Sequence, residues 1–279
     1  MSTMTFRLND LPVELQREIF LLAARSDRST IRQLVWVARK VYAWIQPHIY
    51  EVVSLGNTDT SLFLRSMEYI PPKFFAAHAR KMCLSVSVTA EDAERILRVC
   101  TGVVDLAFWV DYLGTFPNAS IVPFISQLPL QRLSIEHSHF VSLFSASPKP
   151  QHAWCNTLTH LSIIFWTSEI SSPSSELRSL CSLTHLALKM YDVCAPEDYV
   201  HQTLSACETL QVLVIFEHTT DAVEEAGRCD DPRVVYMDSP PQAILDWELQ
   251  ARGDEDCSWA MAEELIKQQA KQRSSSSHI

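Results

Sequence analysis

Hydrophobic and polar positions follow two different periods along this chain. Near the start, apolar residues recur every three or four positions, which predicts amphipathic helices. From about residue 80 onward, short β-rich apolar runs recur instead, separated by helix-compatible pieces. The helical pattern opens in "LNDLPVELQREIF", where Pro12 falls in the first turn, a position that tolerates a missing N–H. The sequence therefore predicts a short helical unit followed by a longer region of strands and helices.

The predicted helices at the start have apolar residues on more than one side. The stripe of the first helix consists of Leu11, Leu15, Ile19, Leu22 and Ala23, and Val13 and Phe20 lie off it. The next stripe consists of Leu34, Val37, Val41, Trp44 and Ile45, and Pro47 should kink or end that helix. So few helical residues bury too little apolar surface to be stable alone. These helices need a second surface, supplied by the rest of the chain or by another protein.

Seven apolar runs recur in the rest of the chain: "RKMCLSV", "VVDLAFWV", "LQRLSIEH", "LTHLSIIFW", "LTHLALKM", "LQVLVIFEH" and "PRVVYMD". Their central residues are Met82, Leu106, Leu133, Leu161, Leu186, Leu213 and Val235, at intervals of 24, 27, 28, 25, 27 and 22 residues. A period in the twenties with an LxxLxL core is typical of leucine-rich repeats. Thr89 is the expected N-cap of one helical piece between the runs. The alternative is an α/β layer protein with a parallel sheet.

Residues 8–55 resemble the F-box, the helical motif that docks onto the Skp adaptor of cullin–RING ubiquitin ligases. Leu11-Pro12, Glu14-Leu15 and Ile19-Phe20 fit its opening pattern, and Leu34, Val37 and Trp44 fall at its later apolar positions. Ala38 departs from the Ser or Cys that is common there. The resemblance implies these adaptor-binding residues: Leu11, Pro12, Leu15, Ile19, Phe20, Val37 and Trp44. The alternative is that the helices cover the core of the rest of the chain.

The end of the chain resembles the tail of fungal proteins that combine an F-box with leucine-rich repeats, of the form "DWE…ARGG.DFW.RA". Asp246-Trp247-Glu248, Ala251-Arg252-Gly253 and Trp259 match it, and Asp254 replaces the second glycine. A repeat array exposes an apolar edge at its end, so we expect Trp247 and Trp259 to be buried there as a cap. "KQQAKQRSSSSHI" has no apolar anchor and is predicted to be disordered.

The predicted fold class is therefore α/β, with an F-box-like helical unit followed by an irregular leucine-rich-repeat-like solenoid and a C-terminal helical cap. The predicted boundaries are 8–55 for the helical unit, 75–240 for the repeats, 241–266 for the cap and 267–279 for a disordered tail.

One column of the predicted repeats is unusually apolar. The position after the last core residue should face solvent, and it reads Trp109, Glu136, Ile164, Lys189 and Phe216. Aromatic and aliphatic anchors beside charges are typical of protein-binding surfaces, so these five are the predicted target-binding residues. The alternative is that a loop or the C-terminal segment folds over this face and makes it core.

Charge and composition limit the classes of partner that the protein is expected to bind. The net charge is −10: residues 1–50 carry seven basic and four acidic side chains, whereas residues 221–279 carry six basic and thirteen acidic ones. A chain with this net negative charge is repelled by phosphate backbones, so no nucleic-acid partner is expected. The basic start fits an acidic protein partner or a solvated helix face. The apolar runs are too short to span a bilayer, so no membrane partner is expected.

No pattern of catalytic or ligand-binding residues emerges. The chain has 5 glycines and neither GxGxxG nor GxxxxGK[ST], and its 8 cysteines form no CxxC pair. His137 and His139 form an HxH pair without a third ligand at a telling spacing. No catalytic residue, cofactor or metal is predicted.

The sequence thus predicts a non-enzymatic substrate receptor of a Skp–cullin–F-box ubiquitin ligase, located in the cytoplasm, the nucleus or both. Its first helices would dock to the Skp adaptor, and the repeats would present an unknown target protein. The alternatives are a repeat scaffold that never joins a ligase and, third, an enzyme.

Overall fold

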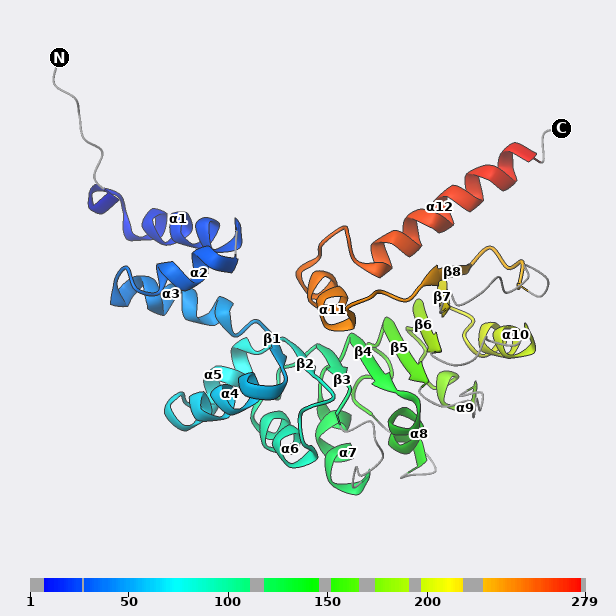
Figure 1. Cartoon of the computed structure of the whole chain (residues 1–279), viewed down its shortest axis with the longest axis horizontal. Helices are drawn as coiled ribbons and strands as arrows, with labels where there is room; N and C mark the ends of the chain where they lie inside the picture. The colour runs from blue at the N-terminus through cyan, green and yellow to red at the C-terminus, as the bar shows by residue number, and fades with distance from the viewer. Residues whose placement is uncertain are drawn as a thin grey trace, which may run out of the picture. The chain divides into compact units, whose positions relative to one another are not determined.

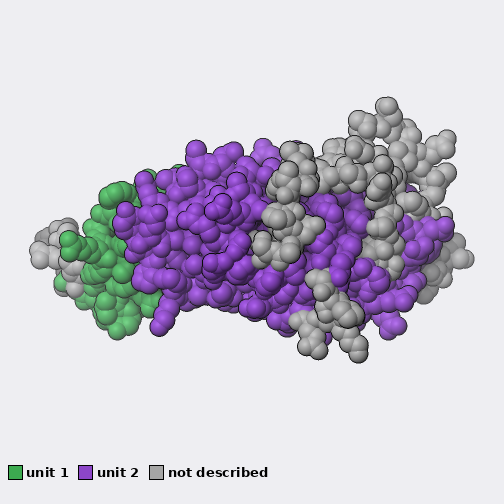
Figure 2. All heavy atoms as spheres, turned by 90° about the horizontal axis from the view of Figure 1, so that it is seen from below, with its two compact units in different colours: residues 1–53 green, residues 54–279 purple. Residues whose placement is uncertain are grey.

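The computed structural model describes residues 8–26, 28–110, 118–145, 152–165, 174–190, 197–217 and 228–276. Its contacts divide the chain into two compact units, residues 1–53 and residues 54–279, coloured separately in Figure 2. The division falls close to residue 55, where the predicted helical segment ends.

The first unit consists of short helices around a small apolar centre. They are η1 (Leu8–Asp10), α1 (Val13–Ser26), α2 (Arg28–Leu34) and α3 (Arg39–Ile49). Pro12 directly precedes α1, and its carbonyl accepts a hydrogen bond from the Gln16 N–H at 3.1 Å. Pro47 lies inside α3, which ends at Ile49, so the predicted helix end is close to the observed one. Ala24, Val41 and Ile45 form the buried centre.

The second unit is built on one eight-stranded sheet whose order, β1 to β8, follows the chain. Its strands are β1 (Val52–Leu55), β2 (Lys81–Leu84), β3 (Asp105–Phe108), β4 (Arg132–Glu136), β5 (His160–Phe165), β6 (His185–Met190), β7 (Val212–Glu217) and β8 (Val234–Asp238). Strands β2 to β8 pair in parallel. The order has no reversal, the place where open parallel sheets usually bind ligands.

The predicted alignment of the apolar runs matches the strand register in all but the last strand. Met82, Leu106, Leu133, Leu161, Leu186 and Leu213 are direct neighbours across β2 to β7. Leu213 then pairs with Val234, not with the predicted Val235. A tight turn precedes β8, in which the Val234 N–H donates to the Asp231 carbonyl at 3.0 Å, and the Leu213 N–H donates to the Arg233 carbonyl at 2.7 Å, which sets the observed pairing.

Helices lie on both faces of the sheet. Those between the strands are α4 (Asn57–Tyr69), α5 (Pro72–His78), α6 (Ala90–Val99), α7 (Asn118–Gln127), α8 (His137–Ser145), α9 (Ser174–Leu177) and α10 (Glu197–Ala206). After β8 follow α11 (Ala243–Arg252) and α12 (Ser258–Ser276), which lie on the side of the sheet opposite α6 to α8 (Figure 1). Thr89 is the N-cap of α6, as predicted, since its hydroxyl oxygen accepts from the Asp92 N–H at 3.2 Å.

The predicted fold class, an F-box-like unit followed by an irregular leucine-rich-repeat-like solenoid with a C-terminal cap, is wrong. The structure is an α/β fold with a single parallel sheet, the alternative that the same pattern of strands and helices allows. Every residue of β3 is buried, and in β5 and β6 only the first residue of each strand is not. Such strands are typical of parallel sheets with helices on both faces.

The C-terminal tryptophans are buried as predicted, but their contacts are not those of an end cap. Trp247 and Trp259 are 3% and 7% exposed. The Trp247 indole N–H donates to Asp105 Oδ1 on β3 at 3.2 Å. The Trp259 ring lies edge-on to His160 on β5 and His185 on β6. The segment therefore lies across the face of the sheet, with α11 against β2 and β3 and α12 against β7 and β8.

Residues 267–276 were expected to be disordered, yet they continue α12. Gln, Ala, Lys and Arg are good helix formers, so the segment extends a helix that tertiary contacts have already started. Arg273 donates to Asp230 Oδ1 at 2.6 Å. The segment is therefore helical without an apolar anchor, since this ion pair is exposed and contributes little by itself.

Replacing Trp259 by alanine should strongly destabilise the second unit, because the indole covers the sheet between β5 and β7. We expect a loss of about 3–5 kcal/mol in the free energy of unfolding, measured by urea denaturation. Met261→Ala in the same helix is the control, since Met261 is 44% exposed and should lose less than about 0.5 kcal/mol. Equal losses in the two variants would contradict this packing.

Candidate functional site

The first unit leaves large apolar side chains exposed on one side of α1 and after α2. Of the predicted adaptor-binding residues, Leu15, Ile19 and Val37 are 51%, 43% and 58% exposed. Pro12 is also exposed and Leu11 is half-buried. Val13, Leu22 and Trp36 are further exposed apolar residues of the unit, and Leu22 shares the side of α1 that carries Leu15 and Ile19. Exposed apolar groups of this kind mark interaction sites when they are contiguous.

Phe20 and Trp44, two further predicted adaptor-binding residues, have a different place. Their rings lie 6.2 Å apart and pack against the centre formed by Ala24, Val41 and Ile45. They therefore hold the helical unit together, and only part of each side chain is accessible. Helix α1 thus uses its two apolar sides separately, one for the internal core and one for the surface.

A buried glutamine holds the start of α1 against α3. Gln16 is 5% exposed, and its amide N–H donates to the Leu11 carbonyl at 2.8 Å. Lys40 Nζ in turn donates to Gln16 Oε1 at 2.7 Å. Leu11, Pro12 and the first turn of α1 are consequently held by hydrogen bonds as well as by apolar packing.

Four of the five predicted target-binding residues are buried, so they do not form an exposed row. Trp109, Ile164, Lys189 and Phe216 are 5%, 3%, 6% and 2% exposed, and Glu136 is half-buried. The alternative considered for this column, coverage by the C-terminal segment, is the observed arrangement. Most residues of this column are apolar because α11 and α12 cover them and make them part of the core.

Polar side chains lie between the sheet and the covering helices. Lys189 Nζ lies 3.9 Å from Asp246 Oδ2, and Asp246 Oδ1 accepts from the Ser258 N–H and hydroxyl at 2.8 and 2.7 Å. Burial lowers the pKa of Lys189, and Asp246 opposes that shift. Burial raises the pKa of Asp105 to about 6, against the lowering effects of Arg132 and Trp247. These contacts attach α11 and the start of α12 to strands β3 and β6.

A small cavity lies within this polar layer. Its volume is about 20 Å³, and Asp105, Ser134, Ser162, Lys189 and Asp246 are among its lining residues. That volume accommodates about one water molecule. The buried Ser162 hydroxyl, which has no hydrogen-bond partner within the described chain, is a suitable contact for one. The cavity thus has room for a water molecule among its charged residues and for no larger group.

A much larger apolar groove opens beside α11, within the second unit. Its volume is about 510 Å³, within the usual range for ligand sites. Its lining residues are Ser85, Val86, Trp109, Ile164, Gln242, Ala243, Ile244, Leu245 and Glu248. Trp109 and Ile164 are the predicted target-binding residues that the structure brings together here. The others were missed, although the exposed pair Ile244 and Leu245, next to the tryptophan motif of the tail, is a signal in the sequence.

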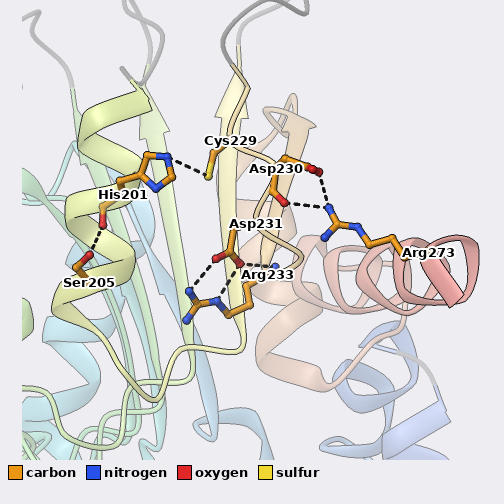
Figure 3. Close-up of polar contacts among 7 residues, drawn as sticks. All are labelled: His201, Ser205, Cys229, Asp230, Asp231, Arg233 and Arg273. Carbon is orange, nitrogen blue, oxygen red and sulfur yellow. Dashed lines mark hydrogen bonds and ion pairs between the residues drawn. The ribbon is translucent and has the colours of Figure 1, made fainter. Parts of the chain in front are cut away.

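Another polar cluster joins α10, the approach to β8 and the end of α12 (Figure 3). Cys229 Sγ lies 4.0 Å from His201 Nε2, a pairing of nucleophile and base. The adjacent carboxylates bind arginines: Asp231 pairs with Arg233 at 2.8 Å, and Asp230 with Arg273 at 2.6 Å. The hydrogen bond from Arg233 lowers the pKa of Asp231. Neither Cys229 nor His201 lines either cavity described above, and within the cluster the Asp230–Arg273 pair links the approach to β8 with the end of α12.

The HxH pair is also structural. Glu136 Oε2 accepts a hydrogen bond from the His139 N–H at 3.1 Å and thereby satisfies the first turn of α8. The His137 ring stacks on Phe165 with centroids 4.6 Å apart. Within the part of the chain that the structure describes, no three His, Cys, Asp or Glu side chains are grouped as metal ligands.

Comparison with models of known protein families gives no match, and comparison with curated proteins gives none either. Among the helices that the structure describes, none combines the length and apolar character needed to cross a membrane.

The stacked histidines under Trp259 should make stability depend on pH. His160 and His185 lie with ring centroids 4.2 Å apart. Burial, then His185 and Arg132, lowers the pKa of His160 to about 3, and burial also lowers the pKa of His185, although Glu263 raises it. The unfolded chain, with pKa values of about 6.5, binds protons first. Stability is therefore lost as the pH falls from about 6.5 towards 3, by at most about 1.4 kcal/mol per pH unit for each histidine.

His160→Gln should lose less stability than the unmodified chain between pH 7 and pH 4, measured by urea denaturation at each pH. His201→Gln, at an exposed histidine, should follow the unmodified chain. Asp105 acts in the opposite sense, since its raised pKa of about 6 means that stability is lost as the pH rises from about 4 to 6. That contribution should be largely common to all three proteins. Identical pH profiles for His160→Gln and the unmodified chain would contradict the assignment.

Proposed function

We propose that this protein is a substrate-receptor subunit of a Skp–cullin–F-box ubiquitin ligase. The first unit docks to the Skp adaptor, and the second unit holds a target protein. One observation carries the proposal: Leu15, Ile19 and Val37, at positions that match the F-box motif, are large, apolar and exposed on a small helical unit.

The two apolar sides of α1 have separate roles. This favours docking to a partner protein over packing against the rest of the chain. The unit already has an internal centre of Ala24, Val41 and Ile45, to which Phe20 and Trp44 add. The residues on the other side of α1 are not needed for that centre. Full burial of a Leu, Ile or Val side chain contributes about 1.5–3 kcal/mol, so a few of them suffice for a specific interface.

The charges of the two units favour different partners. Residues 1–53 carry seven basic and five acidic side chains, whereas residues 54–279 carry 16 basic and 28 acidic ones. A net positive helical unit favours an acidic protein partner, because complementary charge accelerates association and excludes other surfaces. A second unit with a formal charge of −12 favours a basic one.

The proposed role requires no chemistry on this chain. A receptor raises the local concentration of a target lysine beside a ubiquitin-charged enzyme, and holding two reactants in place lowers the entropic part of the barrier. The buried charged residues Asp105, Lys189 and Asp246 are accordingly assigned to attaching α11 and α12 to the sheet.

Replacing Leu15 and Ile19 together by aspartate should weaken binding to a purified Skp adaptor at least tenfold, which is about 1.4 kcal/mol or more. The charges would enter the apolar interface without partners. Isothermal titration calorimetry measures the affinity, and co-purification of co-expressed proteins gives an independent readout.

The control for this experiment is Leu62→Asp on α4 of the second unit, because Leu62 and Leu15 are both 51% exposed. It should bind the adaptor like the unmodified chain. A chain that never binds the adaptor would instead support a scaffold outside any ligase. Equal binding with aspartate at Leu15 and Ile19 would overturn the interface assigned to α1.

A further inference from the structure

We propose that the groove beside α11 is the site that holds the target, and that it takes a peptide segment with a bulky apolar side chain next to a lysine or arginine. This inference deepens the proposed function and depends on it for the identity of the partner as a target protein. The groove is lined by the nine residues named above, all in the second unit.

The lining of the groove selects an apolar group. Six of its nine side chains are apolar: Val86, Trp109, Ile164, Ala243, Ile244 and Leu245. Val86, Ile244 and Leu245 are 44%, 43% and 48% exposed, although each is large enough to stabilise the fold if it were covered. A single exposed aliphatic residue is ordinary, but three that line one groove are a surface for a partner.

Trp109 contributes an apolar surface without an unsatisfied polar group. Its indole N–H donates to the Ser134 hydroxyl at 3.0 Å, on the neighbouring strand β4. Trp109 is 5% exposed, so only an edge of its apolar ring reaches the groove, where it forms part of the floor against which an inserted side chain would pack. Ile164 lies beside it in the lining and is itself 3% exposed, so this part of the groove is rigid core.

Charge selects the group next to the apolar anchor. Glu248 is the only charged side chain among the described lining residues, and Ser54 positions it by donating to Oε1 at 2.6 Å. A carboxylate at an apolar groove, in a unit with 28 acidic and 16 basic side chains, favours a cation on the ligand.

Three fluorescein-labelled decapeptides on a common Gly/Ser background test the proposal by fluorescence polarisation. The first has adjacent leucine and tryptophan flanked by two arginines, the second has glutamates in place of the arginines, and the third has alanines in place of leucine and tryptophan. We expect the first to bind and the other two to bind at least tenfold more weakly. Equal binding of all three, or preference for the glutamate peptide, would overturn the proposal.

Variants of the chain locate the binding. Leu245→Lys should weaken binding of the arginine peptide at least tenfold, and Glu248→Gln should reduce the preference over the glutamate peptide. Leu62→Lys is the matched control, since Leu62 is 51% exposed and Leu245 is 48% exposed. Ile244→Lys is a second groove variant if Leu245→Lys lowers the melting temperature. Equal affinities for groove and control variants would place the peptide elsewhere and overturn the assignment.

Adaptor binding by the same variants separates this inference from the proposed function. Leu245→Lys should keep its full affinity for the Skp adaptor, and the double aspartate variant at Leu15 and Ile19 should keep its affinity for the arginine peptide. Peptide binding without adaptor binding would overturn the ligase role and leave the groove intact. Adaptor binding without peptide selectivity would overturn the groove alone.

Discussion

The burial of Trp247 and Trp259 against the sheet is the interaction on which the rest of the second unit depends. The two indoles belong to helices that follow the last strand, yet they contact β3, β5 and β6. A parallel sheet with apolar residues on both faces is stable only when both faces are covered. The helices between the strands cover one face, and α11 and α12 cover the other.

Apolar packing alone has no direction, so it does not determine where along the strands the covering helices lie. The polar contacts beneath these helices determine their position along the strands. Lys189 faces Asp246, Asp105 accepts from Trp247, and Asp246 caps α12 through Ser258. A buried charge without its partner is costly, which penalises any shifted position of α11 or α12. Further along α12, Ala262 and Ile266 pack against the residues of β7, and the exposed pair of Arg273 with Asp230 lies beyond them.

The packing of α11 and α12 on the sheet also forms the groove. It buries Lys189 and Phe216 almost completely, but near the carboxyl ends of β2 and β3 the first turn of α11 leaves an opening. There Val86 and Leu245 remain partly exposed, and Trp109 and Ile164 line the opening. The surface available to a target is thus much smaller than the column of five residues in the sequence implies, and its chemistry is set jointly by the sheet and by the tail.

The sequence by itself determined the local features of this protein. The central residues from Met82 to Leu213 lie in register, Thr89 caps α6, α1 has two apolar sides, and Trp247 and Trp259 are buried, because each of these follows from neighbouring residues. Only the tertiary structure decided what covers the second face of the sheet, and therefore that Phe216 is core while Trp109 lines a groove. The deciding contacts join distant residues, such as Trp247 and Asp105, which are 142 positions apart. A strand's apolar pattern shows that both of its faces are covered, but it contains no information about which segment covers them.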